Sequence, residues 1–127
     1  GLFAGTKAFN QPLDNWNVSN VTSMRWVFQG TVSFNQPLNS WDVSKVEVMS
    51  QMFERAEAFN QPLDNWNVSN VTDMIGMFSR AVSFSQNLSQ WCVSNIPETP
   101  TYVFGYITIP EEYKPVWGTC PRGENGV

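Results

Sequence analysis

The sequence contains no histidine, so the most common general base and the most common zinc ligand are both missing. Charged residues make up only 14% of the 127 residues, well below the roughly 25% of typical soluble domains. The net charge of −4 leaves no basic surface to collect phosphates, so nucleic acid is not expected as a partner. No run approaches the roughly 20 apolar residues of a membrane-spanning helix, so no membrane span is expected.

Cysteine is also scarce: Cys92 and Cys120 are the only two, too few for a metal cluster. They could form one disulfide, which would imply an oxidising compartment, or stay two unrelated thiols. The disulfide is favoured because both residues fall in or beyond the last repeat described below. The chain begins at Gly1 without an initiator methionine or a signal peptide, which predicts a processed or excised piece of something longer.

What the sequence does contain is a repeated phrase. AFNQPLDNWNVSNVT occurs at 8–22 and again at 58–72, and SFNQPLNSWDVSKVE at 33–47 is a looser copy. Aligned residues recur every 25 positions, and a fixed period of this length is typical of a solenoid. The aligned columns include Phe9, Phe34, Phe59 and Phe84; Gln11, Gln36, Gln61 and Gln86; Leu13, Leu38, Leu63 and Leu88; Trp16, Trp41, Trp66 and Trp91.

The pattern within one unit predicts how each coil folds. Trp16 and Val18 alternate with polar neighbours, the period of 2 that indicates a short strand. The apolar residues of 21–28 then step by 3, 3 and 1, which indicates a helical turn or two. Pro12 fixes φ and predicts a bend before the strand. We therefore expect an α/β solenoid with one short parallel strand and one short helix per 25-residue repeat.

The predicted organisation has two parts. Residues 1–96 form the repeat solenoid, with a partial repeat at 1–8, repeats at 9–33, 34–58 and 59–83, and a degenerate repeat at 84–96. Pro97 and Pro100 end the helical half of the last unit, and TYVFGYITI (101–109) is predicted to be a strand. We expect 97–127 to be a C-terminal cap and tail, because the open end of a solenoid must be covered.

The unit FNQPLDNWNVSNVTDMIGMF resembles the 25-residue repeat of bacterial surface proteins of the BspA type, a divergent leucine-rich-repeat group. The matching phrase is F-N-Q, then L, W-(D/N)-V-S-(N/K)-V, M and M-F, and it covers 1–96 in register. The resemblance implies a leucine-rich-repeat-like, right-handed coil that is secreted or displayed on a cell surface. It also implies adhesion or protein–protein contact and no catalytic activity.

Most candidate sites have a structural interpretation. The Trp column shares the parity of Val18, which favours a place in the core over a row of sugar-stacking platforms. The Gln column favours amides that satisfy the backbone at a bend. Asp14 and Asp64 lie two repeats apart with Asn39 between them, so no metal and no cofactor is expected. The sequons at Asn17, Asn20, Asn67, Asn70 and Asn87 recur with the repeat and leave glycosylation open.

The outward side of the predicted strands is the best candidate binding face, since ladders of short polar side chains there are free to meet a partner. Its residues are Asn15, Asn17, Ser40, Asp42, Asn65, Asn67 and Gln90.

Three hypotheses for function follow. The first is an extracellular or cell-surface protein–protein interaction or adhesion module that is not an enzyme. The second is a structural subunit of a larger assembly that makes contacts through the uncapped edge of the first coil. The third is a carbohydrate-binding module.

Overall fold

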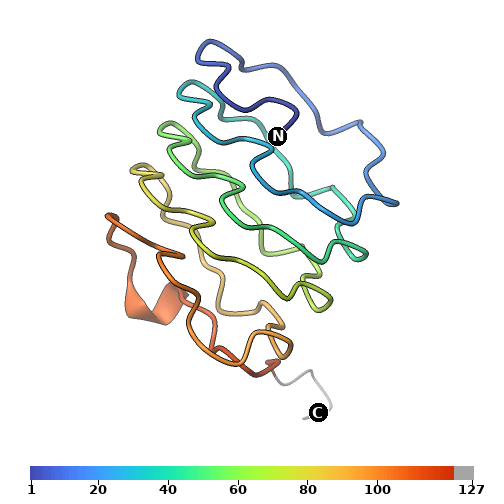
Figure 1. Cartoon of the computed structure of the whole chain (residues 1–127), viewed down its shortest axis with the longest axis vertical. Helices are drawn as coiled ribbons and strands as arrows, with labels where there is room; N and C mark the ends of the chain where they lie inside the picture. The colour runs from blue at the N-terminus through green and yellow to red at the C-terminus, as the bar shows by residue number, and fades with distance from the viewer. Residues whose placement is uncertain (122–127) are drawn as a thin grey trace.

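The structure of the chain is a computed structural model that describes residues 1–121. The chain runs through successive irregular coils stacked along the long axis of the molecule, with the first coil at one end and the last at the other (Figure 1). Within the described residues, the only helix is the 3-10 turn η1, Glu111–Tyr113. Pairing of the β type is limited to two isolated parallel bridges, Ser23 with Val48 and Val48 with Asp73.

The predicted α/β solenoid is therefore wrong. No repeat between residues 1 and 121 contains an α-helix, and none contains a strand longer than a single bridge. The period of 25 is instead expressed in hydrogen bonds between stacked coils, most of which join residues 24 to 26 positions apart.

The backbone hydrogen bonds explain why 21–31 does not form a helix. The N–H groups of Met24 and Phe28 donate to the next coil, at the carbonyls of Val48 and Met52 (2.8 and 2.9 Å). The intervening N–H of Val27 closes a local turn on the carbonyl of Met24 (3.4 Å). Because every second N–H is used between coils, a continuous i→i−4 ladder cannot form. A positive φ at Trp26 (62°) and Gly30 (68°) also breaks the right-handed helical path.

The predicted strand around Trp16 is replaced by two turns. The N–H of Trp16 donates to the carbonyl of Leu13, and that of Val21 donates to the carbonyl of Val18, both at 3.0 Å. Local turns use N–H groups that a parallel sheet would need for its ladder. The alternation of Trp and Val therefore indicates which side chains face inward, but it does not indicate a β-sheet.

The core is a set of side-chain columns, one residue per coil, that run along the stack. Adjacent rings of the Phe28–Phe53–Phe78 column stack with centroids 5.4 and 5.5 Å apart. All three rings are fully buried. Full burial of such a side chain contributes about 1.5–3 kcal/mol, so the stack of repeats, and not any single coil, provides the stability of the fold.

The last coil contains one additional residue. The N–H groups of Phe78 and Arg80 donate to the carbonyls of Val103 and Gly105, an offset of 25 where earlier coils have 24. Residues 101–106 therefore continue the stack in register with 75–80, and Phe104 stacks on Phe78 at 5.8 Å. The predicted strand 101–109 is wrong, because 101–106 form consecutive turns.

Residues 113–120 lie against the final coil. The N–H of Leu88 donates to the carbonyl of Tyr113 (2.8 Å), and the N–H of Val93 donates to the carbonyl of Thr119 (2.9 Å). The division into 1–96 and a cap at 97–127 stays a prediction. Its last residues, 122–127, fall outside the described part of the chain.

Candidate interaction surface

All seven residues predicted for the binding face are exposed, although they lie on turns or irregular segments and not on strands. They differ in what holds their side chains. Three of them brace turns of the backbone, one is tied to a neighbouring coil, and three have side chains without a hydrogen bond within residues 1–121. The structure therefore divides the predicted face into residues that build it and residues that are free to bind.

The bracing residues are Asn17, Asp42 and Asn67. The side-chain Oδ1 of each accepts the N–H of the serine two positions later, at 3.1, 3.0 and 3.1 Å respectively. This arrangement is an Asx turn, in which a short polar side chain substitutes for a backbone acceptor. The Asn or Asp at this position therefore has a structural role in these three coils, and Cys92 takes its place in the fourth.

The carboxylate of Asp42 has a perturbed acidity. The hydroxyl of Ser44 donates to Oδ1 at 2.6 Å, and the N–H of Ser44 donates to the same atom. These two donors, with a smaller contribution from the charge of Lys45, lower the pKa of Asp42 below its ordinary value. Asp42 therefore keeps its negative charge to a lower pH than an ordinary aspartate does.

The free residues are Asn15, Asn65 and Gln90. Only the backbone N–H of Asn65 is engaged, by Oδ1 of Asn39 at 3.0 Å. Ser40, the remaining member of this column, donates its hydroxyl to the carbonyl of Asp14 at 3.2 Å. Three amide side chains are thus presented in repeat register, each with donors and acceptors available to another molecule.

The Asn–Gln columns at the bends are structural, as predicted. Oδ1 of Asn35 accepts the N–H of Asn60 (2.9 Å) and the Nε2–H of Gln61 (3.1 Å). The same pair of bonds recurs between Asn10 and the coil of 35–36, and between Asn60 and the coil of 85–86. These amides connect each coil to the next, which gives them a structural role.

Three of the four column tryptophans are in the core, as predicted. Trp41, Trp66 and Trp91 are buried, and each indole N–H donates to a leucine carbonyl of the preceding coil at 2.8–2.9 Å. Trp16, in the first coil, is 46% exposed instead. It borders an apolar hollow with Leu2, Phe3 and other residues of that coil. The edge of the first coil therefore offers an apolar contact area.

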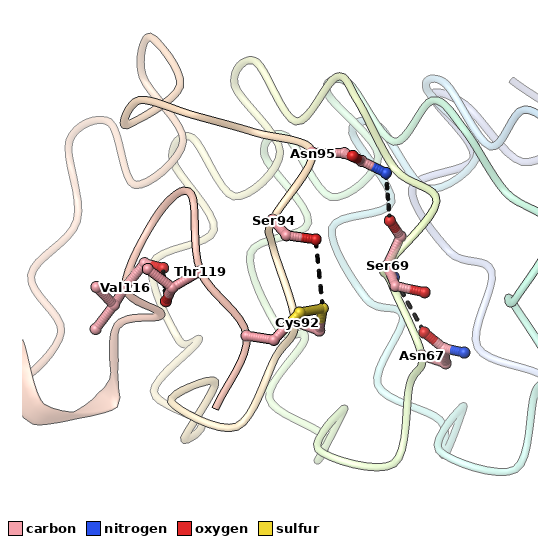
Figure 2. Close-up of a disulfide and its surroundings, with 8 residues drawn as sticks. Asn67, Ser69, Cys92, Ser94, Asn95, Val116 and Thr119 are labelled. Atoms are coloured by element: carbon pink, nitrogen blue, oxygen red, sulfur yellow. Dashed lines mark hydrogen bonds between the residues drawn. A yellow bond between two sulfur atoms is a disulfide. The ribbon is translucent and has the colours of Figure 1, made fainter. Parts of the chain in front are cut away.

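Cys92 and Cys120 are joined in a disulfide in the structure, which ties residues 113–120, the covering segment, to the final coil. Figure 2 shows the disulfide beside Ser94, whose hydroxyl lies 3.7 Å from Sγ of Cys92. Asn95 follows Ser94 on the same segment, and its Nδ2 donates to the carbonyl of Ser69 in the neighbouring coil at 2.8 Å (Figure 2). The disulfide thus lies where the last two coils and the covering segment meet.

The acidic residues do not gather into a metal site. Within residues 1–121 there is no group of three or more histidine, cysteine, aspartate or glutamate side chains placed to hold a metal ion. Asp64 accepts a hydrogen bond from Nδ2 of Asn39 at 3.0 Å, which links it to the neighbouring coil. In the same part of the chain, no helix is long and apolar enough to cross a membrane.

The sequence interpretation missed one group of exposed residues on a different line of turns. Successive coils place Gly5, Gly30, Arg55, Arg80 and Tyr106 at one position, and all five have a positive φ. The signal was present in the alignment, because the 25-residue register changes from glycine to arginine between residues 30 and 55. Tyr106 could be added to this group only from the structure, because the additional residue of the last coil moves it one position out of the 25-residue sequence register.

Stacked irregular coils that share a hydrogen-bond ladder and expose polar columns define a class, the repeat proteins. More particularly, the chain belongs to the family described as Mycoplasma protein of unknown function, DUF285, which its residues 1–111 match. No curated protein and no solved structure matches the chain.

Proposed function

We propose that this chain is a non-catalytic protein–protein interaction or adhesion module of a secreted or cell-surface repeat protein of the BspA type. The observation that carries the proposal is the column of unengaged amides. Asn15, Asn65 and Gln90 are exposed in repeat register, while the equivalent amides at the bends are used to connect coils. A rigid, regular and weakly charged surface of this kind suits recognition of another protein.

Two further features support the extracellular part of the proposal. The disulfide between Cys92 and Cys120 suits an oxidising compartment. The scarcity of charge, 14% of residues, is offset by amide and hydroxyl side chains that keep the surface polar without strong electrostatic fields.

The experiment begins with capture of surface proteins of the native source on the immobilised chain, followed by purification of the protein retained. Affinity of that purified partner is then measured for the wild type and for Asn15→Arg combined with Asn65→Arg. These two side chains hold no hydrogen bond within residues 1–121, so the variant should fold normally. We expect at least a tenfold loss of affinity.

Glu112→Arg is the matched control, because Glu112 is exposed on η1, away from the polar column of Asn15, Ser40, Asn65 and Gln90. It should bind as the wild type does. Unchanged affinity in the double variant would mean that the polar column is not the binding face.

A structural subunit is the second candidate, favoured by the apolar edge of the first coil. Leu2 is 70% exposed there and Trp16 46%, and large exposed apolar side chains that cluster mark contact sites. Sedimentation at increasing concentration tests this candidate. A chain that stays monomeric and leaves Trp16 open to a soluble quencher would count against it. The carbohydrate hypothesis is weakened by the burial of Trp41, Trp66 and Trp91.

A further inference from the structure

A second exposed group of residues lies on the line of positive-φ turns at the C-terminal half of the stack. Arg55, Arg80 and Tyr106 occupy one position in three successive coils, and Tyr102 stacks on Tyr106 with ring centroids 6.0 Å apart. We call these four residues the Arg–Tyr patch. Tyr102 is 61% exposed and Tyr106 68%.

The backbone at these positions is one that favours glycine, although other turns of the stack, at Trp26 and Gln51, also hold non-glycine residues in it. The first two coils fill the same turn with Gly5 and Gly30, at φ of 73° and 68°, and glycine adopts this conformation without strain. Arg55 and Arg80 adopt it at 58° and 60°, which is unfavourable for a residue with a Cβ. Strained residues of this kind cluster at functional sites.

The two guanidinium groups are not neutralised by the chain itself. Within residues 1–121, neither Arg55 nor Arg80 makes an ion pair or a side-chain hydrogen bond, whereas Arg25 is bonded to Ser50 and paired with Asp73. Glu57 lines the same open hollow as both arginines, but it lies beyond the 4.0 Å of an ion pair from either. In a chain of net charge −4, this patch is a local concentration of unpaired positive charge.

Stacking on Tyr106 orients the guanidinium of Arg80 so that it can bind a planar anion. The guanidinium of Arg80 lies over the ring of Tyr106, with Cζ 4.2 Å from the centroid. A guanidinium held by its face keeps its N–H donors at its edge, where they match the two oxygens of a carboxylate. Arginine and tyrosine are also the residues most enriched where protein interfaces gain their affinity.

We propose that the Arg–Tyr patch binds an acidic, extended segment of a partner protein, with Arg55 and Arg80 on carboxylates of alternate residues and Tyr102 and Tyr106 against the backbone. Each patch position comes two residues after a member of the Phe53–Phe78–Phe104 column, whose rings are 5.5 and 5.8 Å apart from coil to coil. Three positions of the patch therefore span two such steps, which about four extended residues bridge at roughly 3.3 Å each. This inference rests on the proposed function, which supplies the premise that the partner is a protein.

The test uses the full chain and a fluorescein-labelled hexaglutamate peptide with an amidated C-terminus, followed by fluorescence anisotropy. We expect saturable binding that weakens as salt rises, because salt screens the attraction between the arginines and the carboxylates of the peptide. The net negative charge of the chain opposes non-specific attraction of the peptide. The variant is Arg55→Gly with Arg80→Gly, which restores the residue that the first two coils use. It should lose at least tenfold in affinity while its unfolding midpoint does not fall.

Lys7→Ala with Lys45→Ala is the matched control, because it also removes two positive charges, but from outside the patch. It should bind hexaglutamate within twofold of the wild type. In the wild type, titration with the peptide should also shift the NMR amide signals of Gly105 and Tyr106, a readout that needs no variant.

Three results would overturn the inference. They are an absence of saturable hexaglutamate binding, an equal loss in the arginine and lysine variants, and binding of an oligogalacturonate at the arginines without binding of the peptide. The last result would identify an acidic polysaccharide as the ligand. Failure here is distinguishable from failure of the proposed function, since the Asn15 and Asn65 variants test partner binding through other residues.

Discussion

Removal of one bend amide tests how the coils are held together. In Asn35→Ala, the N–H of Asn60 and the Nε2–H of Gln61 lose the Oδ1 atom that accepts them at 2.9 and 3.1 Å. A hydrogen bond contributes about 0.5–1.5 kcal/mol net, so two bonds predict a loss of about 1–3 kcal/mol in the free energy of unfolding. Urea denaturation followed by tryptophan fluorescence measures that loss.

Asn35→Asp is the matched control for this prediction. Only the oxygen of the Asn35 side chain is used in the described bonds, and a carboxylate supplies the same acceptor at neutral pH. We therefore expect Asn35→Asp to lie within about 0.5 kcal/mol of the wild type. The reasoning is refuted if the two variants are equally destabilised, or if Asn35→Ala costs nothing measurable.

Three further predictions concern the turns and the disulfide. Arg55→Gly alone should raise the free energy of unfolding by about 1 kcal/mol, because it relieves a positive φ of 58°; a loss in thermal denaturation would contradict this. The pKa of Asp42, measured by NMR, should lie below its ordinary value and should rise in Ser44→Ala. The stability that the Ser44 hydrogen bonds give to the ionised carboxylate is present above the ordinary pKa of aspartate and is lost as the pH falls through the lowered pKa of Asp42. Cys92→Ala with Cys120→Ala opens a link between residues 28 positions apart, so chemical denaturation should show a loss of roughly 3–4 kcal/mol, and an unchanged midpoint would mean that the link contributes nothing.

The sequence was sufficient to predict which side chains face inward. The Phe, Leu and Trp columns are buried together, and the Gln column connects the coils, because a strict period fixes side-chain position whatever the backbone does. Trp16 departs from its column, since no preceding coil lies over it among the described residues, and it is half exposed. Burial was therefore predictable down to the individual column.

The backbone was not predictable in the same way. The spacing of Val21, Met24, Val27 and Phe28 is compatible with a helix, but it fits equally a path in which alternate N–H groups donate to the next coil. Periodicity reports the direction of side chains and not the partners of the peptide groups. The inserted residue before Tyr102 also concealed that 101–106 continue the stack.

The candidate binding face was predicted only in part. The pattern identified the seven exposed polar residues, yet it could not separate the Asx-turn residues Asn17, Asp42 and Asn67 from the free amides, because that difference lies in local hydrogen bonds. The Arg–Tyr patch required the observation that Arg55 and Arg80 share a positive φ with glycines of earlier coils.

The most direct test of the central claim, recognition of a protein by exposed columns of this stack, is an amide hydrogen-exchange footprint of the chain with its purified native partner. We expect added protection in the segments around Asn15, Ser40 and Asn65, with the buried turns of 49–53 unchanged. Protection confined to residues 1–5 at the first-coil edge, with none around Ser40 and Asn65 or over the Arg–Tyr patch, would contradict the claim and favour a structural subunit.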